Sequence, residues 1–218
     1  MVLRGKVDSE RPLPDRISKE YWELFAKKVL EYFYPDRFKE LAAGDSPDLY
    51  NSAIGVEVTS AENRVAREID SLYSRGYTYG DEKERESAAK EIKKLGGIIG
   101  DYYLIHPSYN RDLGRIYDAV KTKTCKLNKN YRFFNENDLF IRTTDMILDE
   151  ELPEVLSCIT ACMSEYTKKY DSVFVCCLGG ELYEFDINRN LHKCACDSWD
   201  AIQQLMMDVR KAIDSKYS

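Results

Sequence analysis

Two acidic residues, Asp48 and Glu57, stand nine positions apart in a stretch whose pattern suits neighbouring strands. Ile54, Val56 and Val58 alternate with Gly55, Glu57 and Thr59, and this period of two with β-branched residues predicts a strand. If Asp48 starts an adjacent extended segment, both carboxylates converge at one side of a sheet edge. With the backbone carbonyl of Val58 they form an all-oxygen site suited to Mg²⁺ or Mn²⁺. Such a metal polarises a phosphodiester oxygen and activates a bound water.

Each of these residues also has a purely structural interpretation, which the sequence leaves open. Pro47-Asp48 is a common turn pair, and Glu57 fits equally well as a solvent-facing residue of a half-buried strand. Thr59 and Glu62 have the spacing of a capping box that opens a helix.

The elements that would position these residues follow from hydrophobic periodicity and from the turn residues between segments. Strand, helix and strand between 139 and 178 make a βαβ unit, which normally joins parallel strands. We therefore expect one α/β domain over residues 1–218, a mixed sheet flanked by helices with a mostly helical insertion at about 61–135. The predicted helices are 18–34, 61–76, 81–95, 109–127, 150–170 and 199–213, and the predicted strands are 54–59, 139–141, 172–178, 181–187 and 191–196.

Pro47-Asp48 followed by Glu57-Val58-Thr59 resembles the motif of the PD-(D/E)XK nuclease superfamily, whose fold the type II restriction endonucleases share. That core runs helix, three strands, helix, strand, and the resemblance covers roughly residues 18–60 and 138–187. It implies a restriction endonuclease-like sheet and a divalent-metal-dependent nuclease that hydrolyses DNA. Asp48, Glu57 and Val58 would then hold Mg²⁺ or Mn²⁺.

The chain departs from the family motif at Thr59, where the family usually has a lysine that orients or activates the attacking water. Lys123 and Lys126 share a helix face and are candidates to replace that lysine, stabilising negative charge on the phosphate. A solvated helix face is the alternative interpretation of this lysine-rich run. The family also often supplies an acidic residue from its first helix, and Glu23 is the candidate here.

The charge distribution is compatible with a nucleic-acid partner although the chain carries a net charge of −6. Residues 115–135 hold six lysine or arginine residues and one acidic residue, Asp118, so positive charge gathers near the expected site. Tyr131, Phe133 and Phe134 follow this run, as aromatic side chains do in many nucleic-acid sites, although core packing is their commoner role.

The longest uncharged run, 155–164, is about half the length that a membrane helix needs. The first 16 residues lack the apolar core of a signal peptide. We therefore expect a soluble, cytoplasmic protein without membrane contact. The oligomeric state stays open, and a dimer is compatible with the sequence.

Seven cysteines, without a CxxC pair, suit reduced thiols. His192, Cys194 and Cys196 suggest a zinc site, but their spacing spreads three ligands over about 13 Å of strand, so buried structural cysteines are the better interpretation. Three functional hypotheses remain. The chain is a Mg²⁺-dependent nuclease, a catalytically inactive nuclease-fold module that binds nucleic acid or protein, or a zinc protein.

Overall fold

The computed structural model describes residues 15–78, 80–100, 104–107, 111–129 and 131–217. The chain divides into two compact units. Unit 1 contains residues 1–21, 62–110 and 210–218, and unit 2 contains residues 22–61 and 111–209. The helical stretch expected between about 61 and 135 is thus shared between them, and every candidate site residue belongs to unit 2.

Unit 2 is built on a mixed β-sheet, which confirms the expected α/β class. Parallel pairing joins β3 to β6 and β6 to β7, and antiparallel pairing adds the other strands. Among the described residues the sheet, in spatial order, contains seven strands: β1 (Ala42–Ala43), β2 (Leu49–Tyr50), β3 (Ile54–Ser60), β6 (Glu136–Thr143), β7 (Ser172–Cys177), β8 (Glu181–Asp186) and β9 (Leu191–Asp197).

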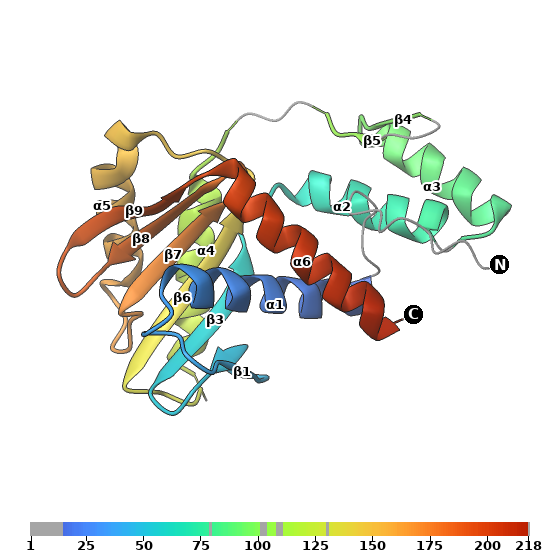
Figure 1. Ribbon diagram of the computed structural model, residues 1–218. Helices are drawn as coiled ribbons and strands as arrows, with labels where there is room; N and C mark the ends of the chain where they lie inside the picture. Colours follow the sequence, from blue (N-terminus) through green and yellow to red (C-terminus); the bar gives the residue numbers. More distant parts are fainter. Residues whose placement is uncertain (1–14, 79, 101–103, 108–110, 130, 218) are drawn as a thin grey trace. The chain divides into compact units, whose positions relative to one another are not determined.

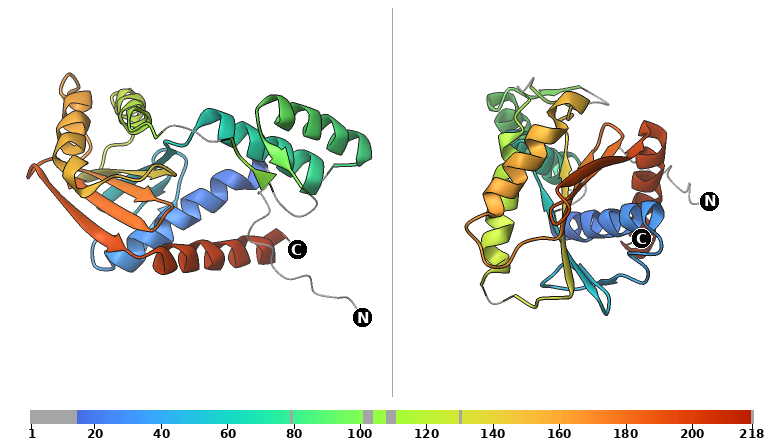
Figure 2. Two further views of the ribbon diagram at one scale, coloured as in Figure 1. Left: turned by 90° about the horizontal axis from the view of Figure 1, so that it is seen from above. Right: turned by 90° about the vertical axis from the view of Figure 1, so that its left-hand side faces the viewer.

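Helices cover both faces of this sheet (Figures 1 and 2). On one face α1 (Asp15–Phe33) places Phe25 against Phe140 of β6, with ring centres 6.3 Å apart. On the other face α4 (Gly114–Leu127) and α5 (Leu152–Met163) pack over a core that includes Leu139. Because Leu139 and Phe140 are consecutive strand residues, they point to opposite faces. Glu57 pairs in register with Leu139, so its side chain lies on the α4 face.

Several element boundaries differ from the sequence prediction: β6 spans Glu136–Thr143 where the sequence predicts 139–141, and α4 begins at Gly114 where the sequence predicts a start at 109. The expected Thr59–Glu62 capping box is wrong, because β3 continues to Ser60 and α2 begins only at Arg64. Asn63 caps that helix instead, and its Oδ1 accepts a hydrogen bond from the backbone N–H of Val65 at 2.8 Å. In unit 2 the helix expected over 150–170 ends at Met163, so residues 164–171 form a connection to β7.

Unit 1 contains a pair of helices and a short hairpin. Ile69, Leu72 and Ile92 form its small buried core. Asp81 caps the second helix, accepting from the Glu84 backbone at 2.9 Å. The elements are α2 (Arg64–Tyr73), the π-helical η1 (Ser74–Thr78), α3 (Glu82–Lys94), β4 (Ile98–Ile99) and β5 (Leu104–Ile105), while the closing helix α6 (Trp199–Tyr217) ends in this unit. Across the described part of the chain, every helix is too short or too polar to span a bilayer.

Candidate functional site

The Asp48 carboxylate is held against β3 by the strand that follows it. Asp48 directly precedes β2, and Leu49 pairs with Val56 in an antiparallel register. Oδ2 of Asp48 accepts a hydrogen bond from the backbone N–H of Val58 at 2.8 Å, and the side chain is buried. The structure therefore places Asp48 beside Glu57, as the strand pairing inferred from the sequence requires.

Glu57 lies in the middle of β3 and is nearly inaccessible to solvent. Its Oε1 forms an ion pair with Nζ of Lys123 from α4, and the two side chains are only 6% and 13% exposed. Its Oε2 is buried and has no hydrogen-bond partner among the described residues. Burial and the neighbouring Asp48 raise the pKa of Glu57, while Lys123 and Lys126 act in the opposite direction. The lysines thus compensate only in part for burial and for Asp48, and the charged form of Glu57 is destabilised.

Two features of α4 and its surroundings bring Lys123 into this position. Ile116, Val120 and Leu127 bury one stripe of the helix against the sheet, which directs the adjoining position 123 toward β3. The Tyr170 hydroxyl donates to the backbone carbonyl of Lys123 at 3.2 Å. Burial, with Glu57 and Asp48 nearby, raises the pKa of Tyr170 well above its usual value, so this hydroxyl stays protonated and remains a donor.

The other candidates occupy different places around the carboxylates. Lys126 is exposed on α4 and acts on Glu57 through its charge. Thr59 is half-buried and lies two residues beyond Glu57 on the same face of β3, which is where the resemblance to the nuclease motif would put its lysine. Glu23 is carried by α1 on the opposite face of the sheet, and its role stays a prediction.

The donors around Glu57 suit a hard cation. Among the described residues, no group of three or more His, Cys, Asp or Glu side chains is arranged to hold a metal ion. The oxygen donors predicted from the sequence are the carboxylates of Asp48 and Glu57 and the carbonyl of Val58. Mg²⁺ is commonly bound by one or two carboxylates and keeps several waters. A bound cation would give the unpartnered Oε2 of Glu57 a ligand and would lower the raised pKa of this carboxyl.

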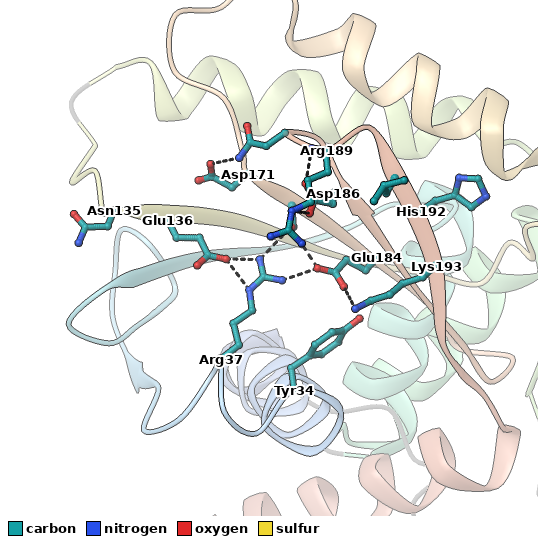
Figure 3. Close-up of a pocket in the computed structure, with 13 residues that line it drawn as sticks. Tyr34, Arg37, Asn135, Glu136, Asp171, Glu184, Asp186, Arg189, His192 and Lys193 are labelled. Carbon is teal, nitrogen blue, oxygen red and sulfur yellow. Dashed lines mark hydrogen bonds and ion pairs between the residues drawn. The ribbon is translucent and has the colours of Figure 1, made fainter.

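A second polar site, which the sequence analysis missed, surrounds Arg37 on the α1 side of the sheet (Figure 3). The guanidinium donates to Glu136 and to Glu184, each at 2.6 Å, and to Asp138 at 2.9 Å. It also lies 5.2 Å from the ring centre of Phe174. Arg37 lines a cavity of about 770 Å³, together with Tyr34, Arg189 and His192.

Arg37 is committed to neutralising buried acids. Asp138 is fully buried, and burial raises the pKa of its carboxyl well above the usual value, although Arg37 opposes this. Burial also raises the pKa of Glu184, but bonds from Lys193, Tyr34 and Arg37 outweigh it and lower the pKa overall. Because the guanidinium donates its hydrogen bonds to three carboxylates of the protein, we interpret this cluster as structural. Acidic residues at strand positions next to apolar ones were the signal that could have revealed it.

The cysteines of the last third serve mainly as packing groups. Cys176 and Cys177 of β7 and Cys196 of β9 are buried, and Cys194 is exposed. Burial raises the pKa of each of these thiols, which suits neutral packing groups better than metal ligands. His192 is exposed and lines the Arg37 cavity.

No known protein family, curated protein or solved structure matches this chain.

Proposed function

We propose that unit 2 is a divalent-metal-dependent nuclease that hydrolyses DNA phosphodiester bonds on a PD-(D/E)XK-like core. The observation that carries this proposal is the ion pair between Lys123 and Glu57. The sequence lacks the motif lysine at position 59, and a lysine from a different element supplies a cation to the same carboxylate. Two carboxylates and a lysine ammonium thus meet at one place in the fold.

The order of elements supports this proposal. The superfamily core has the order helix, three strands, helix, strand. In this chain the same order is given by α1, β1 to β3, α4 and β6, with elements of unit 1 inserted between β3 and α4. Unit 1 contributes residues 62–110 between β3 and α4, which accounts for part of the extra length. Asp48 and Glu57 stand next to β2 and within β3, where the motif carboxylates are expected.

The residues then have distinct roles. Asp48, Glu57 and the Val58 carbonyl would hold Mg²⁺ or Mn²⁺, which supplies Lewis-acid polarisation of the phosphate and a more acidic water. Lys123 stabilises the negative charge that builds on a phosphate oxygen beside Glu57. Tyr170 fixes the backbone of Lys123 through its hydroxyl.

One observation favours a second candidate function. Lys123 forms an ion pair with Glu57, and Thr59 at the motif position carries no charge. A chain with this arrangement can keep the fold and bind nucleic acid or a protein partner without catalysing hydrolysis.

Nicking of supercoiled plasmid in Mg²⁺ or Mn²⁺ distinguishes the nuclease from the non-catalytic binding module. We expect metal-dependent nicking that Glu57→Gln abolishes and that Lys123→Gln lowers about 100-fold or more, the usual effect of removing one charge-stabilising donor. Lys121→Gln and Asp118→Asn are matched controls, because both residues are exposed on the same helix. No nicking by the folded wild-type protein, or equal nicking by Glu57→Gln, would refute the nuclease and leave the binding module.

A further inference from the structure

An exposed aromatic residue, Phe133, lies in the segment that joins α4 to β6. Phe133 is 49% exposed, and Nζ of Lys168 lies 5.2 Å from its ring centre. Lys168 comes from the connection between α5 and β7, which Asn128 fastens to the end of α4. The Asn128 side chain donates to the carbonyl of Lys168 at 2.8 Å and accepts from its N–H at 2.9 Å. A cation and an exposed ring are thus held together by two elements far apart in sequence.

The neighbouring residues tie this ring to β3. Arg132 is exposed and lies over two rings, 4.4 Å from the centre of Phe134 and 5.3 Å from that of Tyr50. Phe134 packs so tightly on Gly55 that a Cβ there would meet its Cδ2 at 2.6 Å. Gly55 and Glu57 share one face of β3 and stand two residues apart, which is about 6.6 Å along a strand. Phe134 therefore packs on β3 two residues before the buried carboxylate, and Phe133 directly precedes Phe134 in the chain.

The exposed cations of the segment 115–135 outnumber its acidic residues. Lys126, Lys129 and Arg132 are exposed within the segment 115–135, whose only acidic residue is Asp118. We call Lys126, Lys129, Arg132, Phe133 and Lys168 the Phe133 surface. Its cations can follow a phosphate backbone, while the Phe133 ring offers a face to a base.

We propose that the Phe133 surface binds single-stranded nucleic acid and leads it to the carboxylates of Asp48 and Glu57. An exposed ring can stack on a base only where that base is unpaired, whereas duplex DNA presents mainly its phosphates to such a surface. The inference rests on the proposed function for the site that the strand reaches. Binding itself requires neither metal nor hydrolysis.

Fluorescence anisotropy of a labelled oligothymidylate in EDTA measures this binding with the chemistry blocked. Replacing a stacking ring by alanine typically weakens binding by about 1–3 kcal/mol per base, so Phe133→Ala is expected to raise the Kd by about fivefold to 150-fold. Phe133→Trp is expected to restore the affinity and Phe133→Leu is not, because only the former keeps an aromatic face. Lys168→Gln is expected to reduce the slope of log K against log salt by about 0.7.

Tyr32→Ala is the matched control, since Tyr32 is 63% exposed but belongs to α1 on the other face of the sheet. The inference is overturned if the folded wild-type protein does not bind the oligothymidylate. It is also overturned if Phe133→Ala binds as tightly as wild type, or if an oligonucleotide duplex binds as tightly as the single strand. Weakened binding by Phe133→Ala, without metal-dependent cleavage of either the plasmid or the oligothymidylate by the wild-type protein, supports the inference while refuting the nuclease, so the two proposals fail separately.

Discussion

Replacing Lys123 by methionine tests the buried ion pair of unit 2 directly. The substitution keeps a long apolar stem and removes the ammonium that neutralises Glu57. Removing one partner of a buried pair costs about 3–5 kcal/mol, because the other charge stays buried and unpaired. Lys123 retains slight exposure, 13%, so we expect a loss near the lower end, about 3 kcal/mol, at neutral pH and above.

The loss must depend on pH in a definite direction. Burial and Asp48 raise the pKa of Glu57, so the folded protein keeps this proton to higher pH than the unfolded chain does. In the window above the unfolded pKa, folding takes up a proton, and the free energy of unfolding falls as pH rises. Lys123 lowers the pKa of Glu57 in the folded protein. Its removal therefore raises this pKa and moves the upper limit of the window to higher pH. At a pH above the window, each unit by which the substitution raises the pKa of Glu57 adds about 1.4 kcal/mol to the loss of unfolding free energy.

Urea unfolding of wild type and Lys123→Met between about pH 5 and about pH 8 measures this loss. The difference in unfolding free energy is expected to grow with pH. The exposed Lys121→Met on the same helix is expected to change stability by less than about 0.5 kcal/mol. Adding Glu57→Gln to Lys123→Met should recover much of the stability, because no charge is then left unpaired. A loss that is equal at both pH values, or is not recovered in the double variant, would refute the argument.

Two further substitutions test other parts of unit 2. Arg37→Met is expected to cost about 3–5 kcal/mol, because it leaves Asp138 and Glu184 without their shared guanidinium, and urea unfolding measures this loss. An unchanged midpoint would contradict the structural role assigned to that cluster. Gly55→Ala is expected to cost about 1–3 kcal/mol, since the added methyl would overlap Phe134. The additional variant Phe134→Leu should relieve that overlap, and a Gly55→Ala protein as stable as wild type would argue against the close contact.

Local patterns in the sequence predicted the parts of the site that lie within one element. The alternation of Ile54, Val56 and Val58 placed Glu57 in a strand, and the spacing of Lys123 and Lys126 placed both on one helix face. Which lysine turns toward β3 depends on how α4 packs on the sheet. That packing joins residues 66 positions apart, and no local pattern contains it.

The Arg37 cluster shows the same limit more strongly. Its partners come from β6 and β8, about 100 and 147 positions away in sequence. An acidic residue among apolar strand residues can signal a buried polar cluster, but hydrophobic patterning does not identify the distant partner that neutralises it. The failed Thr59–Glu62 capping box has a different cause. Thr59 stays in β3, which pairs with β6 one residue beyond its predicted end, through Ser60, and this pairing outweighed a cap that is worth about 1 kcal/mol.

The two outer strands of the large sheet limit how this protein can associate with further chains. A long, flat edge strand acts as a template for aggregation. On one side β1 contains only Ala42 and Ala43, so it offers little backbone to an incoming strand. On the other side the register of β9 shifts between Leu182 and Tyr183 of its partner, and Lys193 stands beside this irregularity. Bulges and edge lysines both discourage continued pairing. The short β1 and the irregular register of β9 therefore both disfavour growth of the sheet by edge-to-edge addition.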